Sequence, residues 1–210
     1  MKRFVRAKAS LNSFFLSGLW PGLAARTVLY ISDYTLTLAC ARIYQEKIRE
    51  TIVFSGSFEL TPYFQRDINS LRRFSPRFVV ALLFVALLLA AIWALSLQTF
   101  PELYAFALGS MILLQLAIHT RHLKNLFMFR RMSRGDAVRG RIEYSRPFVL
   151  NNSATELLVF AGFYAVLLVF VPTWFLLGGV ASCVTTALKH YRLARQALLT
   201  APIASQSQQA

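Results

Sequence analysis

The chain has 210 residues, of which 56% are apolar and 15% charged, and it carries 23 Lys and Arg against 9 Asp and Glu. Such a composition excludes an average soluble domain and indicates an integral membrane protein, mainly α-helical. Two cysteines exclude a disulfide framework. The basic residues form no recognisable base-reading motif, so the net charge of +14 predicts no nucleic-acid partner.

Residues 1–32 are expected to form a basic, amphipathic segment at the membrane interface. Two alternatives stay open. The segment resembles a secretory signal, with a basic start, a modest apolar stretch and small residues at Ala24 and Ala25. Residues 9–31 could instead form a weak additional span, in which Arg26 is the only charge.

Residues 33–75 are expected to form a cytoplasmic segment of helix and strand. Residues 33–50 suit either a covering helix or a further strand through TLTLACARIY, and we favour the helix slightly. A strand near 51–61 follows, because its apolar residues alternate with period two.

Residues 76–120 are expected to form a first transmembrane helical hairpin. Residues 78–101 and 103–120 contain no Asp, Glu, Lys or Arg, and about 20 apolar residues suffice to cross a bilayer. Ser75 before Pro76 suits a helix start, and Pro101 before Glu102 repeats the pattern.

Residues 121–153 are expected to form a cytoplasmic connection with a second strand near 141–151. This strand repeats the first at an offset of 90 residues, which predicts that the two strands pair in a small sheet under the helices. The aligned positions are Ile52, Phe54, Phe58 and Leu60 against Ile142, Tyr144, Phe148 and Leu150.

Residues 154–195 are expected to form a second transmembrane hairpin, because residues 157–188 are uncharged and Pro172 interrupts them. The pattern from Ser153 to Glu156 resembles a capping box and predicts a helix start near residue 154. Small residues at Gly178, Ser182 and Thr186 predict a helix face that packs within the bundle or against another copy of the chain. The tail 196–210 is expected to be disordered.

The basic residues predict the orientation of the two hairpins. Of the 23 Lys and Arg, 12 lie up to Arg77, 8 lie from Arg121 to Arg146, and 3 follow from Lys189 onward. The turns at 99–102 and 171–173 contain none. The positive-inside rule then predicts a multi-pass protein of the cell inner (plasma) membrane, with both termini cytoplasmic and anionic lipid headgroups as partners.

No catalytic, cofactor-binding or metal site is predicted. The sequence contains no zinc-protease motif, P-loop, dinucleotide fingerprint or nucleophile elbow. His119, His122 and His190 would lie at a similar depth, but no carboxylate or cysteine completes a recognisable ligand set in the sequence. The predicted spans also contain no Asp, Glu, Lys or Arg, which proton-coupled carriers usually need.

The function expected from these observations is that of an accessory, assembly or scaffold subunit, which binds a protein partner or another copy through a basic cytoplasmic face. A small oligomeric transporter or channel is the alternative. A lipid-modifying membrane enzyme is the third possibility, with Glu59, Glu143 and the histidines as its polar groups.

Overall fold

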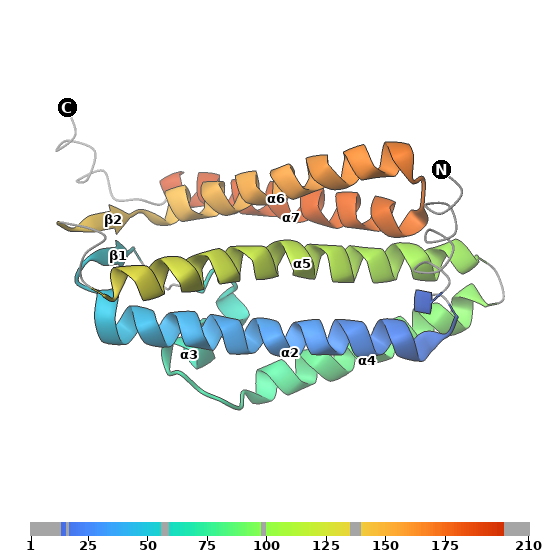
Figure 1. The fold of residues 1–210 in the computed structure, drawn as a ribbon, viewed down its shortest axis with the longest axis horizontal. Coiled ribbons are helices and arrows are strands. Elements are labelled where there is room, and N and C mark those ends of the chain that lie inside the picture. Colours follow the sequence, from blue (N-terminus) through green and yellow to red (C-terminus); the bar gives the residue numbers. More distant parts are fainter. Residues whose placement is uncertain (1–13, 16, 56–58, 98–99, 135–139, 200–210) are drawn as a thin grey trace.

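The computed structural model describes residues 14–15, 17–55, 59–97, 100–134 and 140–199. Its long helices lie side by side along the longest axis of the molecule, and both strands lie at one end, called here the sheet end (Figure 1). The elements are α2 (Leu19–Ile43), the π-helical segment η1 (Tyr44–Ile48), β1 (Ile52–Phe54), α3 (Pro62–Asn69), α4 (Pro76–Ser96), α5 (Pro101–Met132), β2 (Ile142–Tyr144), α6 (Arg146–Phe170) and α7 (Trp174–Leu199).

Capping residues and prolines mark the boundaries of the helices from α4 onward. Ser75 accepts a hydrogen bond from the Phe78 amide at 3.2 Å, and Pro76 opens α4. Pro101 opens α5 in the same way. The chain breaks between α6 and α7 at Pro172, and Thr173 Oγ1 accepts from the Leu176 amide at 3.2 Å. These predicted helix boundaries are confirmed.

The two strands form a parallel two-stranded sheet in the register that the sequence repeat predicts. Ile52 pairs with Ile142, and Phe54 pairs with Tyr144. The predicted strand lengths are wrong, because each strand has only three residues. Leu60 lies outside a strand, and Phe58 lies outside the described residues.

The predicted start of the third helix near residue 154 is also wrong, and the reason is a competing cap. Ser145 accepts from the Phe148 amide at 3.4 Å, and Pro147 occupies the first turn, so α6 begins at Arg146. The second half of the expected strand is therefore helical. Ser153 is buried within α6 and makes contacts with neighbouring helices instead of capping its own.

Helix α2 runs without interruption through residue 32, where the interfacial segment was expected to end. The favoured helix over residues 33–50 is observed through Ile48, and no strand forms there. Gly22 lets α2 approach α5 closely, because a Cβ atom at this position would lie 2.6 Å from the Tyr104 hydroxyl oxygen. The Tyr104 hydroxyl donates to the Leu19 carbonyl at 3.3 Å. Helix α2 is thus part of the bundle.

The small residues of α7 pack against α5 within the same chain. A Cβ atom at Gly178 would lie 2.1 Å from the Phe106 carbonyl oxygen, and one at Gly109 would lie 1.9 Å from the Phe175 carbonyl oxygen. The Ser110 hydroxyl donates to the Gly178 carbonyl at 3.0 Å. Of the two packing partners left open by the sequence, the structure therefore shows the bundle.

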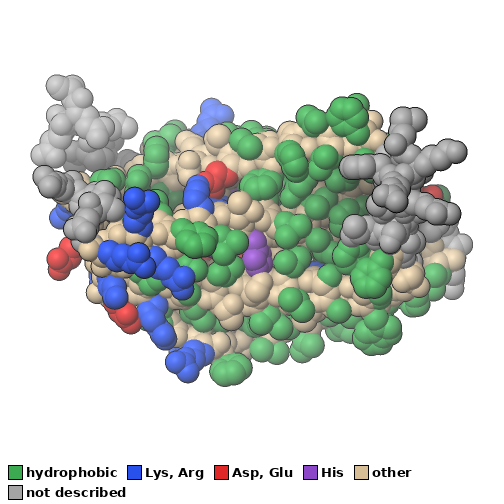
Figure 2. All heavy atoms as spheres, in the orientation of Figure 1, with side chains coloured by type: hydrophobic (Ala, Val, Ile, Leu, Met, Phe, Trp, Pro, Cys, Tyr) green, Lys and Arg blue, Asp and Glu red, His purple; other side chains and the backbone are tan. Residues whose placement is uncertain are grey.

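Three described helices are long and apolar enough to cross a membrane: Pro76–Ser96, Glu102–Met132 and Arg146–Phe170. Helix α4 exposes most of its apolar side chains, since only Leu89 and Ser96 are buried in it. Lys and Arg gather toward the sheet end, whereas hydrophobic side chains cover much of the remaining visible face (Figure 2). The structure thus separates an apolar region from a basic end.

Candidate functional site

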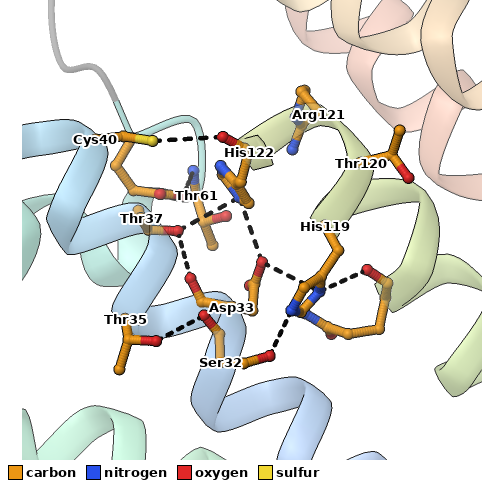
Figure 3. Close-up of polar contacts among 12 residues, drawn as sticks. Ser32, Asp33, Thr35, Thr37, Cys40, Thr61, His119, Thr120, Arg121 and His122 are labelled. Atoms are coloured by element: carbon orange, nitrogen blue, oxygen red, sulfur yellow. Dashed lines mark hydrogen bonds and ion pairs between the residues drawn. The ribbon is translucent and has the colours of Figure 1, made fainter. Parts of the chain in front are cut away.

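A cluster of polar side chains lies between α2 and α5 (Figure 3). Asp33 of α2 faces two histidines of α5. Its Oδ1 lies 3.4 Å from His122 Nε2 and 3.9 Å from His119 Nδ1. Asp33, His119 and His122 are called the Asp–His cluster below.

The contacts of His119 define where its proton lies. His119 Nδ1 is 3.0 Å from the Gln115 carbonyl oxygen, which can only accept, so Nδ1 carries a proton. His119 Nε2 lies 2.5 Å from Ser32 Oγ, and that hydroxyl also lies 3.1 Å from the Leu29 carbonyl. The Ser32 hydroxyl therefore links α2 to His119 of α5.

Asp33 is held in an environment that favours its protonated form. Burial raises the pKa of the carboxyl to about 6, and the nearby His119 opposes this shift. Among the described residues, Asp33 Oδ1 has no hydrogen-bond partner despite being buried. The carboxyl therefore changes its charge near neutral pH, in contact with two histidines.

His122 is fixed mainly by α2. Its Nε2 lies 3.4 Å from Thr37 Oγ1, and the Cys40 thiol contacts the His122 carbonyl oxygen at 3.5 Å. Thr37 Oγ1 also donates to the Asp33 carbonyl at 2.9 Å. Within the described part of the chain, His122 Nδ1 is buried without a hydrogen-bond partner.

His190, the third histidine expected at this depth, does not belong to the Asp–His cluster. His190 of α7 lies at a similar level, but its Nδ1 is 3.0 Å from Ser153 Oγ of α6. Arg121 of α5 donates to the same hydroxyl, so Ser153 joins three helices. One turn further along α5, Lys124 forms an ion pair with Glu156 of α6.

Sequence reasoning missed Asp33 because it assigned residue 33 to a cytoplasmic segment, outside the helices examined for buried charge. The usable signal is an acidic residue with Leu29 and Thr37 one turn away on the same helix face. Arg26, in the segment expected at the membrane interface, was noted only as the single charge of a possible additional span. It is buried, stacks over the Tyr30 ring at 4.2 Å, and its Nη1 has no hydrogen-bond partner among the described residues.

Glu59 and Glu143, the two acidic groups suggested for a lipid-modifying enzyme, lie apart from each other. Glu59 accepts a hydrogen bond from the Thr61 amide at 2.8 Å and lines a cavity that His122 also lines. Glu143 is exposed on β2, opposite Val53. Within the described ranges, no group of three or more His, Cys, Asp or Glu side chains is arranged to hold a metal ion.

No protein-family model, curated protein or solved structure matches this chain in sequence or fold comparisons. Conclusions about its activity therefore rest on the geometry described above.

Proposed function

We propose that this protein is an accessory or scaffold subunit of the cell inner membrane, with four crossings and with its sheet end in the cytoplasm, where it binds a partner protein. The observation that carries the proposal is the gathering of Lys and Arg at the sheet end, beyond the apolar part of the bundle (Figure 2). Helix α7 ends at the sheet end, so its carboxyl end is cytoplasmic in this arrangement, whereas α2 begins at the opposite end of the bundle, where the Tyr104 hydroxyl donates to the Leu19 carbonyl (Figure 1).

Four crossings are supported by the charged residues that end the four uncharged stretches, because these residues lie at one height in the bundle. The uncharged stretches of α4, α5, α6 and α7 end at Arg77, Arg121, Glu156 and Lys189. The contacts of Ser153 with Arg121 and His190, and of Lys124 with Glu156, bring the last three ends to one height. The ring of Phe78 lies 4.5 Å from the ring of Tyr34 between centroids, and Tyr34 is next to Asp33 of the Asp–His cluster, which brings α4 to that height as well.

A hollow at the sheet end is a suitable docking place for the partner. It has a volume of about 780 Å³ and lies among the end of α2, η1 and the strands. Arg49 and Arg141 line it, together with one carboxylate, Glu50. Two exposed guanidinium groups against one carboxylate favour an acidic segment of the partner.

Co-purification in mild detergent from the native membrane tests this proposal. We expect a stoichiometric partner that is retained by the wild-type protein and by Arg134→Glu, and that is lost from the double variant Arg49→Glu, Arg141→Glu. Retention by the double variant would contradict docking at this hollow. A single species without a partner, or only multiples of this chain, would contradict the accessory function.

The Asp–His cluster favours a second candidate function, a proton-coupled transporter. Buried ionisable groups between the helices of a membrane protein are typical of proton pathways. Proton uptake into proteoliposomes with an internal pH indicator tests it. We expect uptake to be abolished in Asp33→Asn and kept in His190→Gln, whereas equal uptake in wild type and Asp33→Asn would exclude this role.

A further inference from the structure

A cavity of about 270 Å³ lies between α5, the start of α6, the residues after β1 and the sheet. Tyr144, Phe148 and Met128 are among its apolar lining residues, and charged and polar side chains line the rest. The cavity lies at the level of Arg121 and Glu156, where the uncharged stretches of the helices end. An amphipathic cavity at this level meets the headgroup region of a bilayer.

The charges that line the cavity are balanced. Arg121 and Lys124 provide two positive charges, and Glu59 and Glu156 provide two negative charges. A site for a simple anion would carry an excess of positive charge, which this lining lacks. A lining that carries charges of both signs fits a ligand that itself carries both signs.

The polar lining of the cavity also contains two buried side-chain atoms that form no hydrogen bond among the described residues. His122 is 8% exposed and lines the cavity, and its Nδ1 has no hydrogen-bond partner. Glu156 Oε2 is likewise buried without a partner, while Oε1 of the same carboxylate binds Lys124. Buried polar atoms are usually satisfied, so a polar ligand group at this place would supply what is missing.

We propose that this cavity binds the headgroup of a zwitterionic aminophospholipid, with the phosphate at Arg121 and Lys124 and the primary ammonium at Glu59 and Glu156. Arg121 carries five N–H donors, one of which Ser153 accepts, and a guanidinium is well suited to phosphate oxygens. The ammonium requires acceptors, which the two carboxylates provide.

The apolar surface beside the cavity indicates why the ligand is a lipid and not a free phosphoamine. On the same face of α6 as Glu156, Val159 is 67% exposed and Phe163 is 58% exposed, so the cavity adjoins apolar surface that runs toward the apolar part of the bundle. Acyl chains that leave the headgroup site can lie along this surface, whereas a free headgroup would leave it uncovered. The inference does not depend on the proposed docking of a partner at the sheet-end hollow, because the two places share only Phe54.

Native mass spectrometry of the full chain, released from nanodiscs of equimolar phosphatidylethanolamine and phosphatidylglycerol, tests the assignment. We expect phosphatidylethanolamine to be retained about five-fold over phosphatidylglycerol, which corresponds to about one additional ordinary hydrogen bond. In Arg121→Gln and in Glu59→Gln this preference should fall to parity. In Arg131→Gln and Glu143→Gln, whose side chains are exposed and do not line the cavity, the preference should be unchanged.

Three results would overturn the assignment. The first is equal or stronger retention of phosphatidylglycerol by the wild type, and the second is an unchanged preference in Glu59→Gln. The third is equally tight binding of soluble phosphoethanolamine, which would identify a free metabolite as the ligand. If Arg121→Gln fails to fold, Lys124→Gln replaces it, because Lys124 is half-exposed and its loss disturbs the helix contacts less.

Discussion

The two faces of α5 are built on opposite principles. Toward α7 it packs closely against Gly178 and Gly179, and the polar contact there is a hydroxyl donating to a carbonyl. Toward α2 it holds Asp33 against His119 and His122. Close packing gives a rigid interface with little dependence on pH, whereas a buried titratable cluster makes the stability of an interface depend on proton concentration.

The largest expected effect is at the α5–α7 interface. Gly178→Ala should lower the free energy of unfolding by about 3 kcal/mol, because the added Cβ would lie 2.1 Å from a backbone oxygen that cannot move aside easily. Chemical unfolding in detergent micelles measures this change. The matched control is Gly162→Ala in α6, where nothing lies within 4 Å of the new Cβ, and it should stabilise by up to about 1 kcal/mol.

An unchanged stability of Gly178→Ala would show that the two helices are further apart than described here.

The next effect is at the α2–α5 interface and depends on pH. The pKa of Asp33 is raised to about 6 from 3.8 by burial, so the folded state binds the proton more tightly than the unfolded state. Wild-type stability should therefore fall as the pH rises from about 4 to above 6, by up to about 3 kcal/mol. Asp33→Asn should match the wild type near pH 4 and exceed it near pH 8. The measurement is unfolding of both proteins across this range.

The opposite result for Asp33→Asn would be equally informative. A variant less stable than the wild type at pH 8 would mean that ionised Asp33 is held by positive charge on His119, which would reverse the sign of the pH dependence.

The smallest effects come from single hydroxyl groups on the two faces. Ser110→Ala removes the donor to the Gly178 carbonyl and should cost about 1 kcal/mol at any pH. Ser32→Ala removes the partner of His119 Nε2 and should cost a similar amount. Unfolding in detergent micelles measures both changes, and an unchanged stability of either variant would contradict the corresponding hydrogen bond.

The sequence by itself determined the features that depend on neighbouring residues. Apolar length indicated helices able to cross a membrane, Pro172 separated α6 from α7, Ser75 with Pro76 placed the start of α4, and the repeat gave the pairing of Ile52 with Ile142. Such features are local, or follow from a pattern with a fixed period, and therefore can be read along the chain.

The tertiary structure decided which of two possible helix caps is used and which polar residues meet in a site. Ser145 and Ser153 both resemble caps, and only the packing of α6 against α5 and α7 assigned Ser153 to Arg121 and His190. Asp33 became part of a site only because α2 lies along α5 and brings it to histidines 86 and 89 residues away (119 − 33 and 122 − 33). Burial and long-range contact set these roles, and neither is a property of a short stretch of sequence.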